Sequence, residues 1–152
     1  NISKNGKPFF EGERFQTGFQ FINSLILEYN KISSNKNPEI AEKLAEILDN
    51  INFMHPFREG NGRTQREFIR TLALQKGFKL NLNPPNNKSI YNRYMNGTIH
   101  SDVKLLKELI LEELIKIQHC CPKRFSSITN FIDFTGFKRC KNAFCDFDPS
   151  FI

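Results

Sequence analysis

Several features are scarce in this sequence, and each absence argues against a class of protein. No apolar run approaches the roughly 20 residues that a membrane-spanning helix needs, so we do not expect a membrane protein. The chain does not open with the basic, apolar and small-residue segments of a secretory signal, so we expect a cytoplasmic protein, with secretion into a host cell left open. The formal charge is +6, but no run of five basic residues occurs. That scatter argues against binding to nucleic acid.

Cysteine is missing from the first two thirds of the chain. The four cysteines lie in the last third, at Cys120, Cys121, Cys140 and Cys145. An even number would allow two disulfides or, with His119, a metal site, but no recognised ligand spacing is present, so we expect reduced thiols. Residues 119–152 also lack a steady hydrophobic period, and we predict no structure for this tail.

Apolar residues spaced by three and four dominate the rest of the chain and predict a mostly helical fold in one domain. The sequence Asn5-Gly6 is typical of a tight turn and predicts a short β-hairpin within about residues 1–10. A first helix follows from Phe15 and ends in the polar stretch 33–37. A second begins with Asn37 as its N-cap and stops near Met54, because the residue before a proline is disfavoured in a helix.

A third helix follows the glycine-containing loop 58–62, and Gly77 is placed to end it. Beyond a loop at 81–87 we expect a short helix at 89–95. Ser101 then caps a longer helix that extends to about Gln118. The unit of interest is the second helix, the loop and the third helix.

The loop before the third helix has the properties of an anion site. Gly60 and Gly62 let backbone N–H groups approach a ligand, and they lie at the positive end of the helix dipole. Arg63 and Arg66 lie in the same turn, where acidic residues are normally preferred. Bound phosphates would resolve this conflict through charge-assisted hydrogen bonds.

Two further residues supply the chemistry of a transfer reaction. Glu59 could hold Mg²⁺, which takes one or two protein carboxylates together with phosphate oxygens. His55 could accept the proton of an attacking hydroxyl. Each feature taken alone is ordinarily structural: a packed histidine, a Gly-Asn-Gly turn, or a solvated face with two arginines.

The twelve residues 55–66 resemble, at every specified position, the motif His-x-Phe-x-(Asp/Glu)-Gly-Asn-Gly-Arg-x-x-Arg of the Fic (filamentation induced by cAMP) family. The resemblance implies a Fic-type helical bundle with a short β-hairpin flap. It also implies an enzyme, a protein adenylyltransferase and hence a nucleotidyltransferase. Its substrates would be ATP with Mg²⁺ and a hydroxyl-bearing target protein.

The resemblance assigns a role to each motif residue. His55 would deprotonate a Ser, Thr or Tyr hydroxyl of the target, which attacks the α-phosphorus of ATP. Glu59 would hold Mg²⁺, and Phe57 would be buried and structural.

The phosphate groups would be bound by the second half of the motif. Gly60, Asn61 and Gly62 would form the anion hole. Arg63 would grip the β-phosphate and Arg66 the γ-phosphate.

Outside the motif, the resemblance covers about residues 1–118, the Fic core. It implies that the hairpin is a flap on which the target docks, through Ile2, Ser3, Lys4 and Asn5. Family members usually have further helical sequence before the flap, so we expect part of the domain to lie outside these residues.

The short helix near residue 91 resembles the region that lines the nucleotide base pocket in the family. Tyr91 and Asn92 are the expected contacts there. Tyrosines at helical spacing are also common core residues.

Many family members are held inactive by a helix that carries the motif (Ser/Thr)-x-x-x-Glu-(Gly/Asn). This sequence departs from the family because it has no complete match to that motif. The nearest string here is Ser24 to Glu28, which Tyr29 follows. We therefore expect any inhibition to come from a small antitoxin-like partner or from N-terminal sequence outside these residues, with Arg66 as the docking point. Two alternatives stay open: transfer of UMP, phosphocholine or phosphate by the same fold, and a nucleotide-binding module without turnover.

Overall fold

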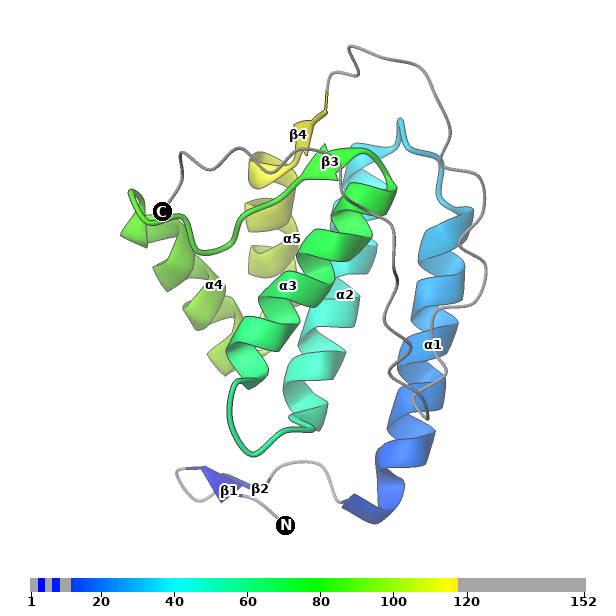
Figure 1. The fold of residues 1–152 in the computed structure, drawn as a ribbon, viewed down its shortest axis with the longest axis vertical. Helices are drawn as coiled ribbons and strands as arrows, with labels where there is room; N and C mark the ends of the chain where they lie inside the picture. Colours follow the sequence, from blue (N-terminus) through cyan, green and yellow to red (C-terminus); the bar gives the residue numbers. More distant parts are fainter. Residues whose placement is uncertain (1–2, 5–6, 9–11, 118–152) are drawn as a thin grey trace, which may run out of the picture. The chain divides into compact units, whose positions relative to one another are not determined.

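The computed structural model describes residues 3–4, 7–8 and 12–117. Its described part contains a 3-10 helix, η1 (Gly12–Arg14), followed by the five α-helices α1 (Phe15–Lys31), α2 (Asn37–Met54), α3 (Asn61–Gln75), α4 (Lys88–His100) and α5 (Val103–Glu113) (Figure 1). The predicted mostly helical fold is confirmed. The tail 119–152, with its four cysteines, lies outside the described residues.

Helix α2 is the centre of the fold and packs against α1, α3 and α5 (Figure 1). Apolar residues at helical spacing supply this packing, because Ile40, Leu44, Ile47 and Leu48 are all fully buried, while Ile51 is half-buried. Full burial of such a side chain contributes about 1.5–3 kcal/mol relative to exposure. Helix α4 packs on α5. The end of α2, where His55 lies, is therefore held by a well-buried helix.

Polar contacts fasten α1 to the end of α3. The buried Tyr29 hydroxyl donates to the Leu72 carbonyl at 2.7 Å. The Lys76 ammonium donates to the carbonyls of Asn30 and Ile32, at 2.9 and 2.7 Å. These bonds fix the C-terminal half of α1 at the opposite end of α3 from the motif.

Two short antiparallel sheets complete the described part. Strands β1 (Ser3–Lys4) and β2 (Lys7–Pro8) pair with Ser3 opposite Pro8 and Lys4 opposite Lys7, as expected for the predicted hairpin. Strands β3 (Phe78–Lys79) and β4 (Ile115–Lys116) pair across the far end of α3. Gly77, at φ 81°, makes the turn from α3 into β3, as predicted.

Several predicted boundaries were wrong. Helix α5 ends at Glu113 rather than near Gln118, because the next residues pair with β3. Asp102, not Ser101, caps α5, and its carboxylate accepts from the Leu105 N–H at 2.9 Å. Ser101 instead ends α4, which extends past the predicted 89–95 to His100.

The second helix also begins one residue differently from the prediction. Lys36 occupies the N-cap position of α2 without a side-chain capping bond, and Asn37 is the first helical residue. Among the described residues, no helix combines the length and the apolar character needed to cross a bilayer.

Candidate active site

His55 ends α2 in a backbone conformation that is uncommon for a residue with a side chain. Its φ and ψ are 44° and 58°, in the left-handed region, and its N–H donates to the Ile51 carbonyl at 3.1 Å. The sequence predicted that the helix stops here because Pro56 follows. Left-handed residues other than glycine cost free energy and concentrate at functional sites.

The imidazole of His55 is oriented by the last turn of its own helix. Its Nδ1 lies 3.3 Å from the backbone carbonyl oxygen of Asn52. Because a carbonyl oxygen only accepts hydrogen bonds, this contact favours the tautomer with the proton on Nδ1. The lone pair of that tautomer is on Nε2, the nitrogen that can take up a proton.

The loop after His55 is held by the side chain of Asn61. This asparagine is 4% exposed; its Oδ1 accepts from the Phe57 N–H at 2.9 Å, and its Nδ2 donates to the Phe57 carbonyl. The amide thus closes a ring around residues 57–61. The expectation that Phe57 is buried was wrong: its side chain is 43% exposed. Asn61 holds the backbone of Phe57 in place, and the ring points outward.

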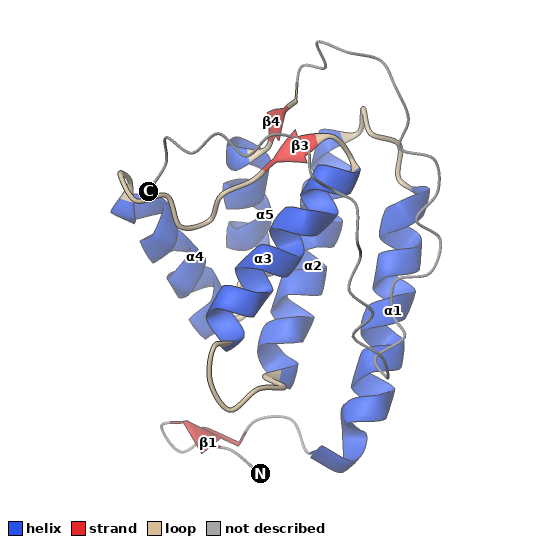
Figure 2. Cartoon of the chain, in the orientation of Figure 1, coloured by secondary structure: helices blue, strands red, loops and turns tan. Residues whose placement is uncertain are grey.

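A loop leads from the end of α2 to the start of α3 (Figure 2). Gly60 occupies the N-cap position at φ 82° and has no side chain with which to cap the helix. The helix begins at Asn61, so Gly62 belongs to its first turn. The sequence predicted instead that Gly62 lies in the preceding loop. Thr64 makes the first helical bond, to the Gly60 carbonyl at 3.0 Å. The N–H groups of the preceding residues of that turn have no acceptor within the helix.

Both motif arginines lie next to the glycines of this helix start. A Cβ atom added at Gly60 would be 3.6 Å from Nη2 of Arg63, and one added at Gly62 would be 3.3 Å from Nη1 of Arg66. The first turn of α3 contains no acidic residue. Two guanidinium groups and the positive helix end therefore point to one anion site.

Arg66 also rests on two tyrosine rings of α4. Its guanidinium carbon is 5.4 Å from the ring centroids of both Tyr91 and Tyr94. Burial raises the pKa of the Tyr94 phenol, and the nearby charge of Arg66 offsets part of that rise. The structure thus brings the predicted Tyr91 to the motif through Arg66. Asn92 is exposed on α4.

Glu59 precedes Gly60 in the loop and is exposed. Among the described residues, no group of three or more His, Cys, Asp or Glu side chains could hold a metal ion. A cation at this site would therefore need ligands from phosphate and water besides Glu59. That is the ordinary coordination of Mg²⁺ in nucleotide sites, so the carboxylate fits the expected role.

The predicted flap is described only in part. Ser3 and Lys4 form β1, whereas Ile2 and Asn5 lie outside the described residues. The pairing of β1 with β2 agrees with a hairpin at this position. The docking of a target on it stays a prediction.

A line of buried polar side chains behind the motif was not predicted from the sequence. Gln65 is 2% exposed and Tyr94 is 1% exposed. The Tyr94 hydroxyl donates to Oε1 of Gln65 at 3.2 Å, and Nε2 of Gln65 donates to Oδ1 of Asn52 at 3.4 Å. The available signal was Gln65 itself, a polar residue four positions before Ile69 on the buried face of α3.

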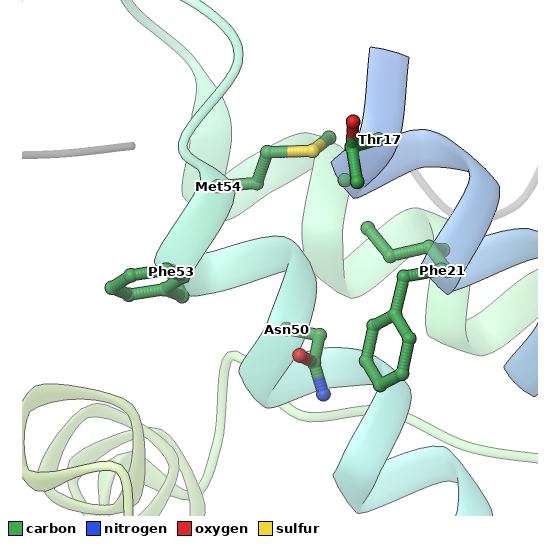
Figure 3. A pocket seen from close by; sticks show the side chains of 7 residues that line it. Thr17, Phe21, Asn50, Phe53 and Met54 are labelled. Carbon is green, nitrogen blue, oxygen red and sulfur yellow. The ribbon is translucent and has the colours of Figure 1, made fainter. Parts of the chain in front are cut away.

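An apolar cleft of about 180 Å³ lies between α1 and α2. Figure 3 shows Thr17 and Met54 pointing toward one another across it, with Phe21 and Phe53 at its walls. None of the predicted site residues lines this cleft. The chemistry therefore points to the start of α3 rather than to this hollow.

Comparison with known proteins supports the same segment. The model of the Fic/DOC family matches residues 3–73, which include the whole motif. A protein adenylyltransferase of Bartonella henselae is 38% identical over 73 residues, which are 48% of this chain and 13% of that protein. The protein adenylyltransferase VbhT of Bartonella schoenbuchensis is 45% identical over 42 residues, 28% of this chain and 9% of that protein. The chain thus spans only a small part of these curated relatives.

Solved structures share the helical arrangement. The N-terminal Fic domain of a VirB-translocated Bep effector protein from Bartonella quintana, with bound ADP, has a TM-score of 0.65 at 25% identity, over 77% of this chain and 56% of that chain. The type IV secretion system effector protein BepA has a TM-score of 0.60 at 28% identity, over 75% of this chain and 39% of that chain. With the motif inside the matched residues 3–73, the chain is similar to the Fic/DOC family in its motif, and its helical part has the fold of these solved Fic-domain structures.

Proposed function

We propose that this chain transfers AMP from ATP to a hydroxyl group of a target protein. The observation that carries the proposal is the uncapped start of α3, with Arg63 and Arg66 beside its glycines, directly after His55. Relatives named protein adenylyltransferases and an ADP-bound neighbouring structure support it.

The reaction would use the phosphate-binding surface of α3 and the imidazole at the end of α2. The target hydroxyl oxygen attacks the α-phosphorus, the bond from that phosphorus to the bridging oxygen breaks, and pyrophosphate leaves. His55 takes the hydroxyl proton on Nε2, since the Asn52 carbonyl favours the proton on Nδ1. The N–H groups of the first turn of α3 would stabilise the charge on the phosphate oxygens.

The arginines would bind the leaving phosphates. Arg63, which folds back toward Gly60, is assigned to the β-phosphate, and Arg66, supported by two tyrosine rings, to the γ-phosphate. Mg²⁺, held by Glu59, would neutralise charge between the phosphates. The side chain of Asn61 holds the loop, so its contribution to the anion hole would come from its backbone N–H.

The test is transfer of label from ATP to proteins of a cell lysate in the presence of Mg²⁺. Label from the α position, with none from the γ position, is the expected result. Transfer of γ label would identify a kinase, and label from UTP or a choline donor would identify the other group transfers. Nucleotide binding without any transfer would identify a regulatory module.

The His55→Ala variant is the matched control for this experiment. Loss of the general base should lower the rate about 10²–10⁴-fold, with the fold intact by circular dichroism. An unchanged rate would remove His55 from the mechanism.

Regulation by a small antitoxin-like protein is a separate proposal. A carboxylate of such a partner would pair with Arg66 and exclude the γ-phosphate. Co-expression should then yield a complex that Arg66→Ala weakens, and a pull-down without any such protein would contradict the idea. Whether the target lies in the producing cell or in a host stays a prediction.

A further inference from the structure

The polar line behind the motif, in which Gln65 and Tyr94 are buried and Asn52 is half-buried, connects three helices. Asn52 lies on α2, Gln65 on α3 and Tyr94 on α4. Buried amide and hydroxyl groups cost free energy unless they are hydrogen-bonded, and apolar side chains would fill such positions without that requirement. The position of Gln65 on the buried face of α3 would suit leucine, as at Leu72 on the same face. A polar residue at position 65 therefore needs an explanation other than packing.

One end of the line reaches the proposed base. Asn52 is the residue whose carbonyl oxygen meets Nδ1 of His55 at 3.3 Å. Its side chain is held on two sides: Nδ2 donates to the Thr98 carbonyl at 2.8 Å, and Oδ1 accepts from Gln65. The residue that orients the imidazole is thus fastened to α3 and α4.

The other end of the line reaches the phosphate-binding arginine. Gln65 directly precedes Arg66, and the Tyr94 hydroxyl that donates to Gln65 belongs to a ring beneath the Arg66 guanidinium. Gln65 is therefore the residue through which α3, the helix that carries the phosphate ligands, bonds to α2, the helix that carries the base.

We propose that Gln65, bonded to Asn52 and to the Tyr94 hydroxyl, is a positioning residue that fixes His55 of α2 relative to the phosphate-binding start of α3. The inference rests on the proposed transfer reaction. It separates the position of the base from the binding of nucleotide. Every proposed phosphate ligand except the cation lies in the loop or on α3, whereas the base lies at the end of α2. Loss of the link should misplace the base and leave nucleotide binding intact.

The first experiment compares isosteric variants of the line. Gln65→Met removes both of its bonds, and Tyr94→Phe removes only the hydroxyl and keeps the ring under Arg66. We expect kcat to fall about tenfold or more in Gln65→Met, since small misplacements of a catalytic group are that costly. The dissociation constant for a non-hydrolysable ATP analogue should not change.

Tyr29→Phe is the matched control. It also deletes one buried tyrosine hydroxyl that bonds α3, but at the Leu72 end of the helix, away from the motif. It should lower the melting temperature as Tyr94→Phe does and leave kcat unchanged. An equal loss of kcat in Tyr29→Phe and Tyr94→Phe would show a general effect of stability and overturn the proposal.

The double variant Gln65→Met, Tyr94→Phe separates stability from position. Replacing both partners by apolar groups removes the unpaired hydroxyl, so the melting temperature should recover in part. The rate should not recover if the line positions His55. A rate that returns together with stability would identify a purely structural role.

A readout that needs no transfer activity keeps this inference distinct from the proposed function. The ring nitrogen chemical shifts of His55 report its tautomer and its contact with the Asn52 carbonyl. They should change in Gln65→Met and stay unchanged in Tyr29→Phe. Identical His55 signals in all variants would overturn the positioning role, whether or not the protein transfers AMP, whereas absent transfer by the unaltered protein would overturn only the proposed function.

Discussion

The α2–α3 and α4–α5 junctions begin with the same unusual backbone: α2 ends on His55 at φ 44° and α4 ends on Ser101 at φ 52°. Among the described residues, these are the two non-glycine positions with positive φ. The two junctions differ in how the following helix is capped. Asp102 follows Ser101 and satisfies the Leu105 N–H with its own carboxylate at 2.9 Å.

At the α2–α3 junction, the N-cap residue makes no side-chain capping bond. Gly60 offers no side chain to the first turn of α3, and that turn carries Arg63 and no acidic residue. One junction therefore caps its helix with a side chain of its own, and the other leaves the first turn of its helix without a side-chain cap from the N-cap residue, as the proposed phosphate site requires. The comparison shows that an uncapped helix start is informative when a capped one exists in the same fold.

The largest effect should come from replacing the two left-handed residues by glycine, one at a time. His55→Gly should lower AMP transfer about 10²–10⁴-fold, whereas Ser101→Gly should leave it unchanged. Stability should change little in either variant, because glycine avoids the roughly 1–2 kcal/mol cost of a left-handed side chain but makes the unfolded chain more flexible. Transfer assays and urea denaturation measure both quantities. Full activity in His55→Gly would make the two junctions equivalent.

Reversing the charge in the first turn of each helix sharpens the contrast. Arg63→Glu should raise the KM for ATP about 10²-fold, because charged hydrogen bonds of about 1.5–3 kcal/mol are lost and repulsion replaces them. Lys104→Glu, in the first turn of α5, should leave KM unchanged. Both variants should gain a little stability from the helix dipole, about 0.3–1 kcal/mol. Equal effects on KM would remove the special role of α3.

Removing the internal cap tests the other junction. Asp102→Ala should lower the free energy of unfolding by about 1 kcal/mol, because the Leu105 N–H loses its acceptor. Asp102→Asn keeps an acceptor and should lose less. Denaturant titration gives the values, and a fall in the transfer rate with either variant would link this junction to the site.

The smallest effect concerns the carboxylate that lies beneath the α4–α5 junction. Burial raises the pKa of Asp49, and its hydrogen bond with Ser101 opposes that rise. One of its oxygens is buried and has no hydrogen-bond partner among the described residues. Because the pKa of Asp49 is raised in the folded state, the folded protein binds more protons than the unfolded chain between the ordinary pKa of an aspartate and this raised pKa. The stability of the fold therefore falls as the pH rises through that range.

The variant Asp49→Asn removes this titration. It should melt at a higher temperature than the unaltered protein at neutral pH, and the difference should shrink as the pH falls toward about 4, the ordinary range of an aspartate. Calorimetry across this pH range measures it. A difference that stays constant with pH would exclude Asp49 as its source.

Much of the fold could be predicted because its helices carry clear apolar stripes. The four buried residues of α2 were expected from their spacing, and Pro56 correctly indicated where that helix stops. The end of α5 could not be found in this way, because Leu114 and Ile115 continue the apolar pattern of the helix. Ile115 and Lys116 become a strand only by pairing with β3. Such long-range pairing leaves no local signal.

The candidate site shows the same division. The uncapped glycines and the arginines could be predicted from twelve consecutive residues. The bonds among Asn52, Gln65 and Tyr94 could not, because they depend on how three helices pack. The burial of Phe57 was predicted wrongly because the family pattern carries no information on which way this loop turns the ring.

The ring of hydrogen bonds between Asn61 and Phe57 has a thermodynamic consequence for a ligand. Ordering one residue of a flexible loop costs about 1–2 kcal/mol in backbone entropy. Here the side chain of Asn61 holds both the N–H and the carbonyl of Phe57, so that cost is met during folding. An incoming nucleotide would then meet a preorganised surface, and more of its interaction energy would appear as affinity.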